Sequence, residues 1–84
     1  MNIIEAHSAI DTKEDLERFI GSLKNDLRLN PDFWGNTDLE SFLDAMQSWV
    51  GAMEHYYRNN DLTMADPPTW KVFGDILMGA RIYE

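Results

Sequence analysis

An unusually wide apolar face between residues 39 and 57 constrains the fold of this 84-residue chain more than any other feature. One apolar stripe recurs there at helical spacing, formed by Leu39, Leu43, Met46, Val50, Met53 and Tyr57. A second group widens this stripe on one side, namely Phe42, Ala45, Trp49, Ala52 and Tyr56. At about 100° per residue, the combined face covers roughly half of the helix circumference. A face this wide predicts a central helix that packs between two neighbours, with most of these side chains in the core.

Signals at both ends place this helix at about residues 38–59. Thr37 and Glu40 match a capping box, in which the side chains at the two ends of the first turn each accept a backbone N–H. Asn59 and Asn60 follow the last turn, and asparagine tolerates the left-handed conformation that often ends a helix.

A second helix is predicted at about residues 12–29. Thr12 can cap it together with Asp15, an arrangement similar to a capping box. The helix ends before Pro31, because the residue that precedes a proline is disfavoured in the α region. Its apolar stripe consists of Leu16, Phe19, Ile20, Leu23 and Leu27.

A third helix is predicted at about residues 67–83. Asp66 is the expected cap, and Pro67 occupies the first helical position, where its missing N–H costs nothing. Lys71 and Asp75 are four residues apart and are expected to pair on the solvent side. The apolar stripe consists of Trp70, Phe73, Ile76, Leu77, Ala80 and Tyr83.

These patterns predict an all-α fold, a compact three-helix bundle that forms a single small domain over residues 1–84. Residues 1–11 are expected to form a short N-terminal arm. Its apolar side chains could dock either as an extended segment or as a helical turn, and the sequence leaves both open; these side chains are Ile3, Ile4 and Ile10.

The charge and composition limit the classes of partner. Fifteen acidic and seven basic side chains give a net charge of −8, which repels nucleic acids and anionic membranes and favours a basic protein partner. The chain has no cysteine, its first residues lack the features of a signal peptide, and no 18 apolar residues run together. We therefore expect a soluble, cytoplasmic protein that binds neither nucleic acid nor membrane.

No motif points to catalysis, a metal or a cofactor. Ser48 and His55 are seven residues apart on one helix, about 10 Å along its axis, which is too far for a nucleophile and its base. Neither His55 nor His7 follows a glutamate at the spacing of a carboxylate-bridged di-iron site, and no glycine-rich phosphate loop occurs. The prediction is a non-enzymatic protein with no catalytic residues, no metal site and no cofactor.

Four glycines fall inside the predicted helices, where each costs about 1 kcal/mol relative to alanine. They are Gly21, Gly51, Gly74 and Gly79. Gly21 and Gly51 lie away from the apolar stripes of their helices. Either something approaches those backbones closely or the helices are simply imperfect, and the sequence does not decide between these explanations.

The order of aromatic and polar residues along the chain resembles a family of small uncharacterised bacterial proteins, a domain of unknown function. The resemblance covers about residues 12–84 and is carried by Trp34, Asn36, Leu39, Phe42, Leu43, Ala45, Met46, Trp49, Tyr56, Tyr57, Pro68, Trp70, Lys71, Phe73, Ile82, Tyr83 and Glu84. It implies a partner-binding role similar to that of immunity proteins or antitoxins, and it implies no catalytic residues.

The favoured hypothesis is therefore a protein–protein interaction module that binds, and as an immunity-like protein inhibits, a basic partner. The candidates for partner contact are Trp34, Asn36, Tyr56, Lys71, Met78 and Ile82. One alternative is a structural homodimer that uses the surface around Met78 and Ile82. Another is a small-ligand binder whose pocket lies between the aromatic side chains Trp34, Trp49, Tyr56 and Trp70.

Overall fold

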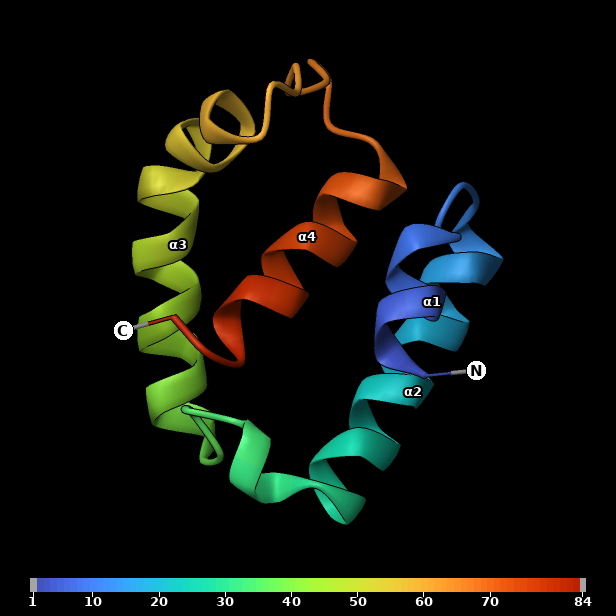
Figure 1. The fold of residues 1–84 in the computed structure, drawn as a ribbon, viewed down its shortest axis with the longest axis vertical. Helices are drawn as coiled ribbons and strands as arrows, with labels where there is room; N and C mark the ends of the chain where they lie inside the picture. The colour runs from blue at the N-terminus through green and yellow to red at the C-terminus, as the bar shows by residue number, and fades with distance from the viewer. Residues whose placement is uncertain (1, 84) are drawn as a thin grey trace.

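The computed structural model describes residues 2–83, and the chain folds as an all-α protein within that range (Figure 1). The predicted fold class is confirmed. The α-helices are α1 (Ile3–Ser8), α2 (Lys13–Leu29), α3 (Leu39–Asn59) and α4 (Trp70–Ala80), and a short 3-10 helix, η1 (Pro31–Phe33), follows α2. None of the helices within residues 2–83 has the length and apolar character needed to cross a membrane.

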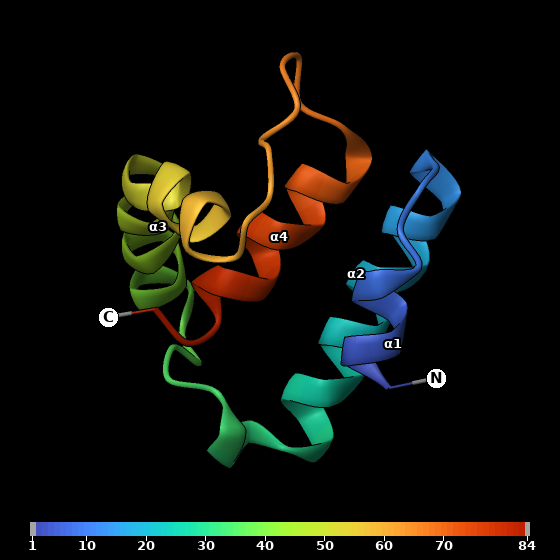
Figure 2. The same ribbon diagram turned by 45° about the horizontal axis from the view of Figure 1, so that its top comes forward.

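The shortest of the three long helices, α4, occupies the centre of the fold. It packs against α1, α2 and α3, whereas α3 packs against α4 alone among the helices of the described chain. Figures 1 and 2 both show α4 between α3 on one side and the α1–α2 pair on the other. The prediction that the helix at residues 38–59 is central is therefore wrong. The helical periodicity predicted the width of the apolar face correctly, but it could not show how much of that face other helices cover.

The helix starts follow local hydrogen bonds. The capping box of Thr12 and Asp15 is confirmed at the start of α2. At the start of α3, the Asp38 carboxylate accepts the backbone N–H of Ser41 at 2.8 Å, so the box predicted for Thr37 and Glu40 is wrong. Aspartate is as good an N-cap as any residue, and here it displaces the threonine before it.

The predicted start of the last helix is also wrong. Its cap is Thr69, whose side chain accepts the backbone N–H of Val72, and not Asp66. Pro67 cannot begin the helix, because it is itself followed by Pro68 and is therefore disfavoured in the α region. The helix then ends at Ala80, before the predicted end at residue 83.

The N-terminal segment is helical, which decides between the two predicted forms of the arm. Asn2 caps α1 by accepting the backbone N–H of Glu5 at 2.9 Å. Ala6 and Ile10 are buried, while Ile4 is exposed. The buried cluster that joins α1 to α2 consists of Ala6, Ile10, Phe19 and Leu23, with Ile3, Leu16, Trp34, Leu77 and Met78 packed against it.

Two of the four helical glycines allow neighbours to approach α4 closely. A Cβ atom at Gly79 would overlap the indole ring of Trp49 on α3, and one at Gly74 would overlap the end of the Ile10 side chain. Nothing lies within 4 Å of the corresponding positions at Gly21 and Gly51. Close approach within the described chain thus explains Gly74 and Gly79 and leaves the other two unexplained.

The contact between Gly79 and Trp49 predicts opposite effects for two glycine substitutions. We expect Gly79→Ala to lower the free energy of unfolding by about 1–3 kcal/mol, because the new methyl group must displace a rigid, buried indole. Gly51→Ala is the matched control and should raise it by up to about 1 kcal/mol, since alanine favours the helix and nothing is displaced. Urea denaturation of both variants measures the difference. Similar changes in the two variants would contradict the close approach of α3 to α4.

Candidate functional site

The main polar feature of the structure is a buried carboxylate on the central helix. Asp75 is 5% exposed, and its two oxygens accept hydrogen bonds from three different side chains. Oδ1 accepts from His7 Nε2 on α1 at 2.6 Å and from Lys71 Nζ on α4 at 2.8 Å. Oδ2 accepts from the Tyr57 hydroxyl on α3 at 2.7 Å. This cluster of four side chains, the Asp75 cluster, joins α1, α3 and α4.

The carboxylate determines the arrangement of protons in the cluster. Because an ionised carboxylate only accepts hydrogen bonds, His7 must carry its proton on Nε2. Lys71 Nζ lies 3.3 Å from the same nitrogen, and since both groups are donors, we interpret this as a contact between two donors that share Oδ1. His7 is therefore held in one orientation, with Nε2 as the donor.

Burial and hydrogen bonding act in opposite directions on Asp75. Burial by itself raises the pKa of Asp75, but the hydrogen bonds from His7, Lys71 and Tyr57 outweigh it and hold the pKa below its usual value. Burial, together with the hydrogen bond to the Asp75 carboxylate, raises the pKa of Tyr57 well above its usual value. At neutral pH the aspartate is thus ionised and the tyrosine keeps the proton that it donates.

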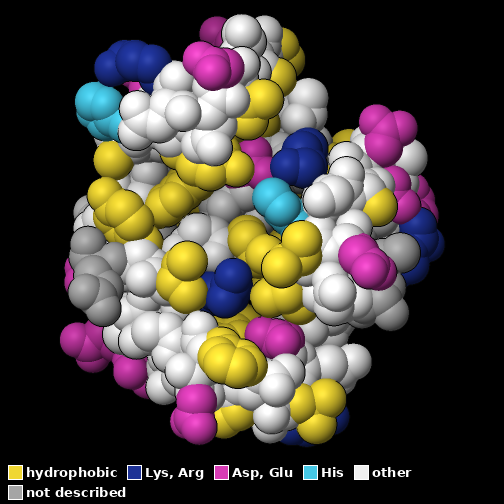
Figure 3. All heavy atoms as spheres, in the orientation of Figure 1, with side chains coloured by type: hydrophobic (Ala, Val, Ile, Leu, Met, Phe, Trp, Pro, Cys, Tyr) yellow, Lys and Arg dark blue, Asp and Glu magenta, His cyan; other side chains and the backbone are white. Residues whose placement is uncertain are grey.

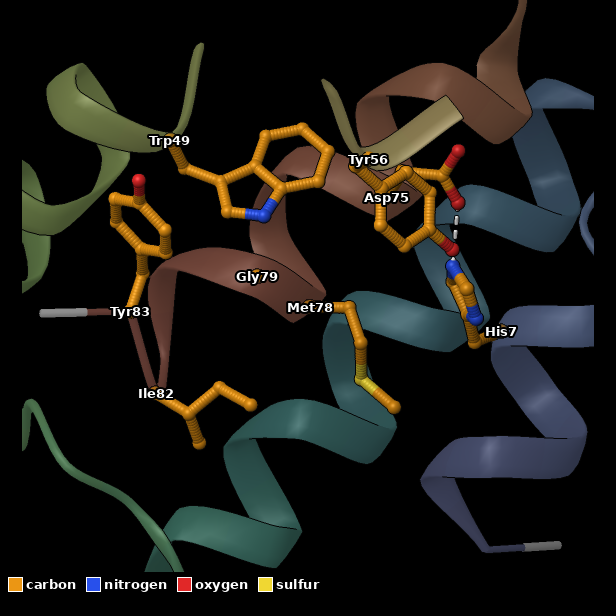
Figure 4. A pocket seen from close by; sticks show the side chains of 8 residues that line it. All are labelled: His7, Trp49, Tyr56, Asp75, Met78, Gly79, Ile82 and Tyr83. Atoms are coloured by element: carbon orange, nitrogen blue, oxygen red, sulfur yellow. Dashed lines mark hydrogen bonds and ion pairs between the residues drawn. The ribbon is translucent and has the colours of Figure 1, made fainter. Parts of the chain in front are cut away.

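The Asp75 cluster borders a cavity of about 460 Å³ between α1, α3 and α4. We call it the aromatic cavity, and it is lined by His7, Trp49, Tyr56, Asp75, Met78, Gly79, Ile82 and Tyr83 (Figure 4). Figure 3 shows the same face of the molecule, where hydrophobic side chains surround a hollow. His7 and Asp75 supply the polar end of the cavity, and aromatic and aliphatic side chains supply the rest.

A second concave surface lies between α2 and the first turn of α3. This α2–α3 groove has a volume of about 430 Å³ and is mostly apolar, lined by Ile20, Leu23, Lys24, Leu27, Trp34, Asn36, Thr37, Asp38, Leu39, Phe42 and Leu77. From the groove, the apolar stripe of α3 continues into solvent: Leu39, which lines the groove, is 72% exposed, and Leu43 and Val50 beyond it are 52% and 44% exposed. This apolar face was predicted to lie mostly in the core, and for these three residues that prediction is wrong, because no other helix of the described chain covers that side of α3.

Two of the six predicted contact residues lie in the groove, and both also hold the fold together. The Trp34 indole donates to Asp26 Oδ2 at 2.7 Å and stacks on Phe42. Asn36 Nδ2 donates to the backbone carbonyls of Ala80 at 3.0 Å and Tyr83 at 2.9 Å. Asn36 thereby satisfies the carbonyl of the last residue of α4, which has no partner within the helix, and a second carbonyl beyond the helix. It does not cap the start of α3, where Asp38 is the cap.

The other four predicted contact residues lie near the aromatic cavity or the buried carboxylate. Tyr56, Met78 and Ile82 line the cavity, and Ile82 is half exposed. Lys71 pairs with Asp75 as expected, but the acid is buried and the pair does not lie on the solvent side. The six residues therefore belong to two separate surfaces and do not form one patch.

The ligand pocket expected between four aromatic side chains is only partly assembled. Trp49 and Tyr56 line the aromatic cavity, with ring centroids 5.5 Å apart. Trp34 lies in the groove, and Trp70 packs on Phe73 away from both. The cavity is completed by residues that the sequence did not suggest, above all Tyr83, His7 and Asp75.

Sequence reasoning missed the Asp75 cluster because its members are far apart in the chain. His7 and Asp75 are separated by 68 residues, and His7 lies in a segment with no clear pattern. One signal was available. The helix that carries Asp75 is apolar on nearly every side, and a helix of this kind is usually buried, so an acid within it needs partners.

The chemical options of the site are narrow. No group of three or more His, Cys, Asp or Glu side chains within residues 2–83 could hold a metal ion. The residues that line the aromatic cavity include no serine, threonine or cysteine nucleophile beside His7. The cavity offers an apolar surface with one histidine held in a fixed orientation at its polar end. The predicted absence of catalysis stays a prediction.

A family model described as "Family of unknown function (DUF7660)" matches residues 12–84, so the chain belongs to that family. The predicted resemblance to a domain of unknown function is confirmed over the predicted range. The chain matches none of the curated proteins and none of the solved structures. Glu84, one of the residues on which the resemblance was based, lies outside the described residues.

The Asp75 cluster predicts a specific loss of stability in acid. We expect Asp75→Asn to lower the free energy of unfolding at pH 7 by about 2–4 kcal/mol, because an amide cannot replace a buried carboxylate that accepts from three donors. The pKa of Asp75 is lower in the folded state, so its contribution is present above pH about 4 and is lost as the pH falls below that value. Urea denaturation at pH 7, 5 and 3.5 measures both effects.

The matched control is Asp44→Asn, which changes an exposed aspartate on α3. It should change the free energy of unfolding by no more than about 0.5 kcal/mol and keep the acid dependence of the wild type. Asp75→Asn should flatten that dependence only in part, because backbone N–H groups also lower the pKa of Asp15 and of Asp38. Equal behaviour of the two variants would show that the cluster contributes nothing to stability.

Proposed function

We propose that this member of the DUF7660 family is a protein-binding module whose α2–α3 groove accepts an apolar segment of a basic partner protein. The observation that carries the proposal is the uncovered apolar stripe on α3, where Leu39, Leu43 and Val50 project into solvent. Apolar side chains scattered singly over a surface need no explanation. A stripe that continues into an apolar groove is typical of an interaction site.

The shape of the groove supports a helical or extended segment as the occupant. Side chains of α2 and α3 form its two walls, and Leu77 of α4 contributes from the central helix. Amphipathic helices bind in grooves of this kind through apolar side chains spaced three or four residues apart. Beyond the groove, the exposed Leu43 and Val50 extend the contact along α3 by more than one turn.

The charges beside the groove favour a basic partner. Asp38 lines the groove, and helical spacing puts Glu40 and Glu54 beside the exposed stripe, three residues before Leu43 and four residues after Val50. The net charge of −8 adds a long-range attraction for cations. Lys24 lies on the opposite wall, so the basic side chains of the partner are expected on the α3 side.

The same charges disfavour a second copy of the chain as the occupant. Two copies each carry a charge of −8, and pairing their α3 stripes would bring like charges together. A basic partner removes this repulsion. If the partner is a toxic enzyme, binding at the groove would make the chain an inhibitor similar to an immunity protein or antitoxin.

Affinity capture with variants of the chain tests the proposal. We expect the immobilised wild type to retain a basic protein from extracts of its own source at about 0.05 M salt and to release it at about 0.5 M, because charge attraction is screened. Replacing Leu39 and Leu43 together by serine should reduce retention at least about tenfold, since two apolar contacts are lost. Both positions are exposed, so the fold should tolerate the change.

Leu62→Ser is the matched control, because Leu62 is as exposed as Leu43 but lies between α3 and α4 and outside the groove. It should retain the partner as the wild type does. Retention that is equal in the groove variant and the control would contradict the assignment of the groove. A doubled molar mass in solution that the groove variant loses would identify a second copy as the occupant and overturn the basic partner.

A further inference from the structure

The aromatic cavity contains a hydrogen-bond donor that none of its walls satisfies. Trp49 is 7% exposed, and its indole lies against the backbone of Gly79. Figure 4 shows its Nε1 on the cavity side, with no hydrogen bond to any of the other residues that line the cavity. The indole of Trp34, by contrast, donates to Asp26 at 2.7 Å. Within the described residues no buried side-chain nitrogen or oxygen lacks a hydrogen-bond partner, so this N–H is not an orphaned buried group. An indole N–H that reaches the cavity can donate to a ligand there.

The walls of the cavity are suited to a small ring. Trp49, Tyr56 and Tyr83 present aromatic surface, and Met78 and Ile82 present flexible aliphatic surface (Figure 4). The volume of about 460 Å³ lies within the usual range for small-molecule sites, which are largely apolar with a few polar groups that fix the orientation.

The charges next to the cavity favour an anionic group on that ring. The Arg81 side chain lies against the cavity wall, with its Nε 3.4 Å from the sulfur of Met78. Lys71 lies at the polar end, within 3.3 Å of His7 Nε2. Among the described residues that line the cavity, Asp75 supplies the one carboxylate, which already accepts from three donors and is poorly placed to attract a cation. Lys71 is itself paired with Asp75 at 2.8 Å, so Arg81 is the positive side chain that we take to face a ligand.

We propose that the aromatic cavity binds a small aromatic carboxylic acid. The ring lies among Trp49, Tyr56 and Tyr83, one acceptor oxygen takes the Trp49 Nε1–H, and the carboxylate faces Arg81. This site does not rest on the proposed function, because the residues that line the cavity and those that line the α2–α3 groove do not overlap.

Nuclear magnetic resonance reports on this donor directly. The chain has three tryptophans, so its ¹H–¹⁵N spectrum contains three indole signals, and Trp49→Phe assigns the relevant one. The probes are phenylacetate, phenylacetamide and phenethylamine, which share a ring and differ in charge. We expect phenylacetate to move the Trp49 signal with a Kd of about 1 mM, as is usual for so small a ligand, and phenethylamine to bind at least about tenfold more weakly.

Two variants separate the proposed contacts from nonspecific binding. Arg81→Gln removes the charge while keeping a polar side chain, and it should weaken phenylacetate about tenfold while leaving phenylacetamide unchanged. Lys24→Gln removes a positive charge in the groove and should change neither. If no probe moves the Trp49 signal, or if phenethylamine binds as well as phenylacetate, the proposal is wrong. An equal loss of affinity in both variants would also overturn it, because it would indicate attraction by net charge alone.

Discussion

Burying the Asp75 carboxylate is the constraint on which the arrangement of the helices depends. An ionised group at this depth is tolerated only when donors replace the water that it loses, and here those donors come from α1, α3 and α4 itself. Tyr57 fixes the position of α3 beside α4, and His7 fixes α1 on another side. The two glycines that face Ile10 and Trp49 then let the backbones come close enough for these hydrogen bonds to form. Removing any one of these features would leave the carboxylate short of partners.

The α2–α3 groove has a geometric origin, the difference in length between α3 and α4. At about 1.5 Å per residue, the 21 residues of α3 span about 32 Å and the 11 residues of α4 span about 17 Å. The contacts of Trp49 with Gly79 and of Tyr57 with Asp75 place α4 along the C-terminal part of α3. The first turns of α3 therefore extend beyond α4, and their leucines face the groove and solvent.

The sequence predicted the individual helices well, but it predicted poorly which helix faces are covered by distant segments of the chain. The reason is physical. Helical periodicity and caps depend on neighbours within a few residues, so the extent of α2, its capping box at Thr12 and the approximate limits of α3 could be read from the chain. The side of α3 that α4 covers depends on contacts between distant segments, and Leu39 and Tyr57 look equally apolar in the pattern although one is exposed and the other buried. The candidate site was harder still, since the bond between His7 and Asp75 leaves no trace in the spacing of either segment.

The groove and the cavity share one structural connection, which determines how far they can act independently. Asn36 lines the groove and donates to the backbone of Tyr83, whose side chain lines the cavity. The backbone N–H groups of Gly35 and Asn36 both donate to the carbonyl of Arg81, at 2.9 and 3.0 Å. If the proposed partner displaced the segment before α3, it would pull on the residues that follow α4, and the proposed ligand would hold those residues in place. Because coupling between two binding sites is reciprocal, any effect of the ligand on partner affinity must equal the effect of the partner on ligand affinity.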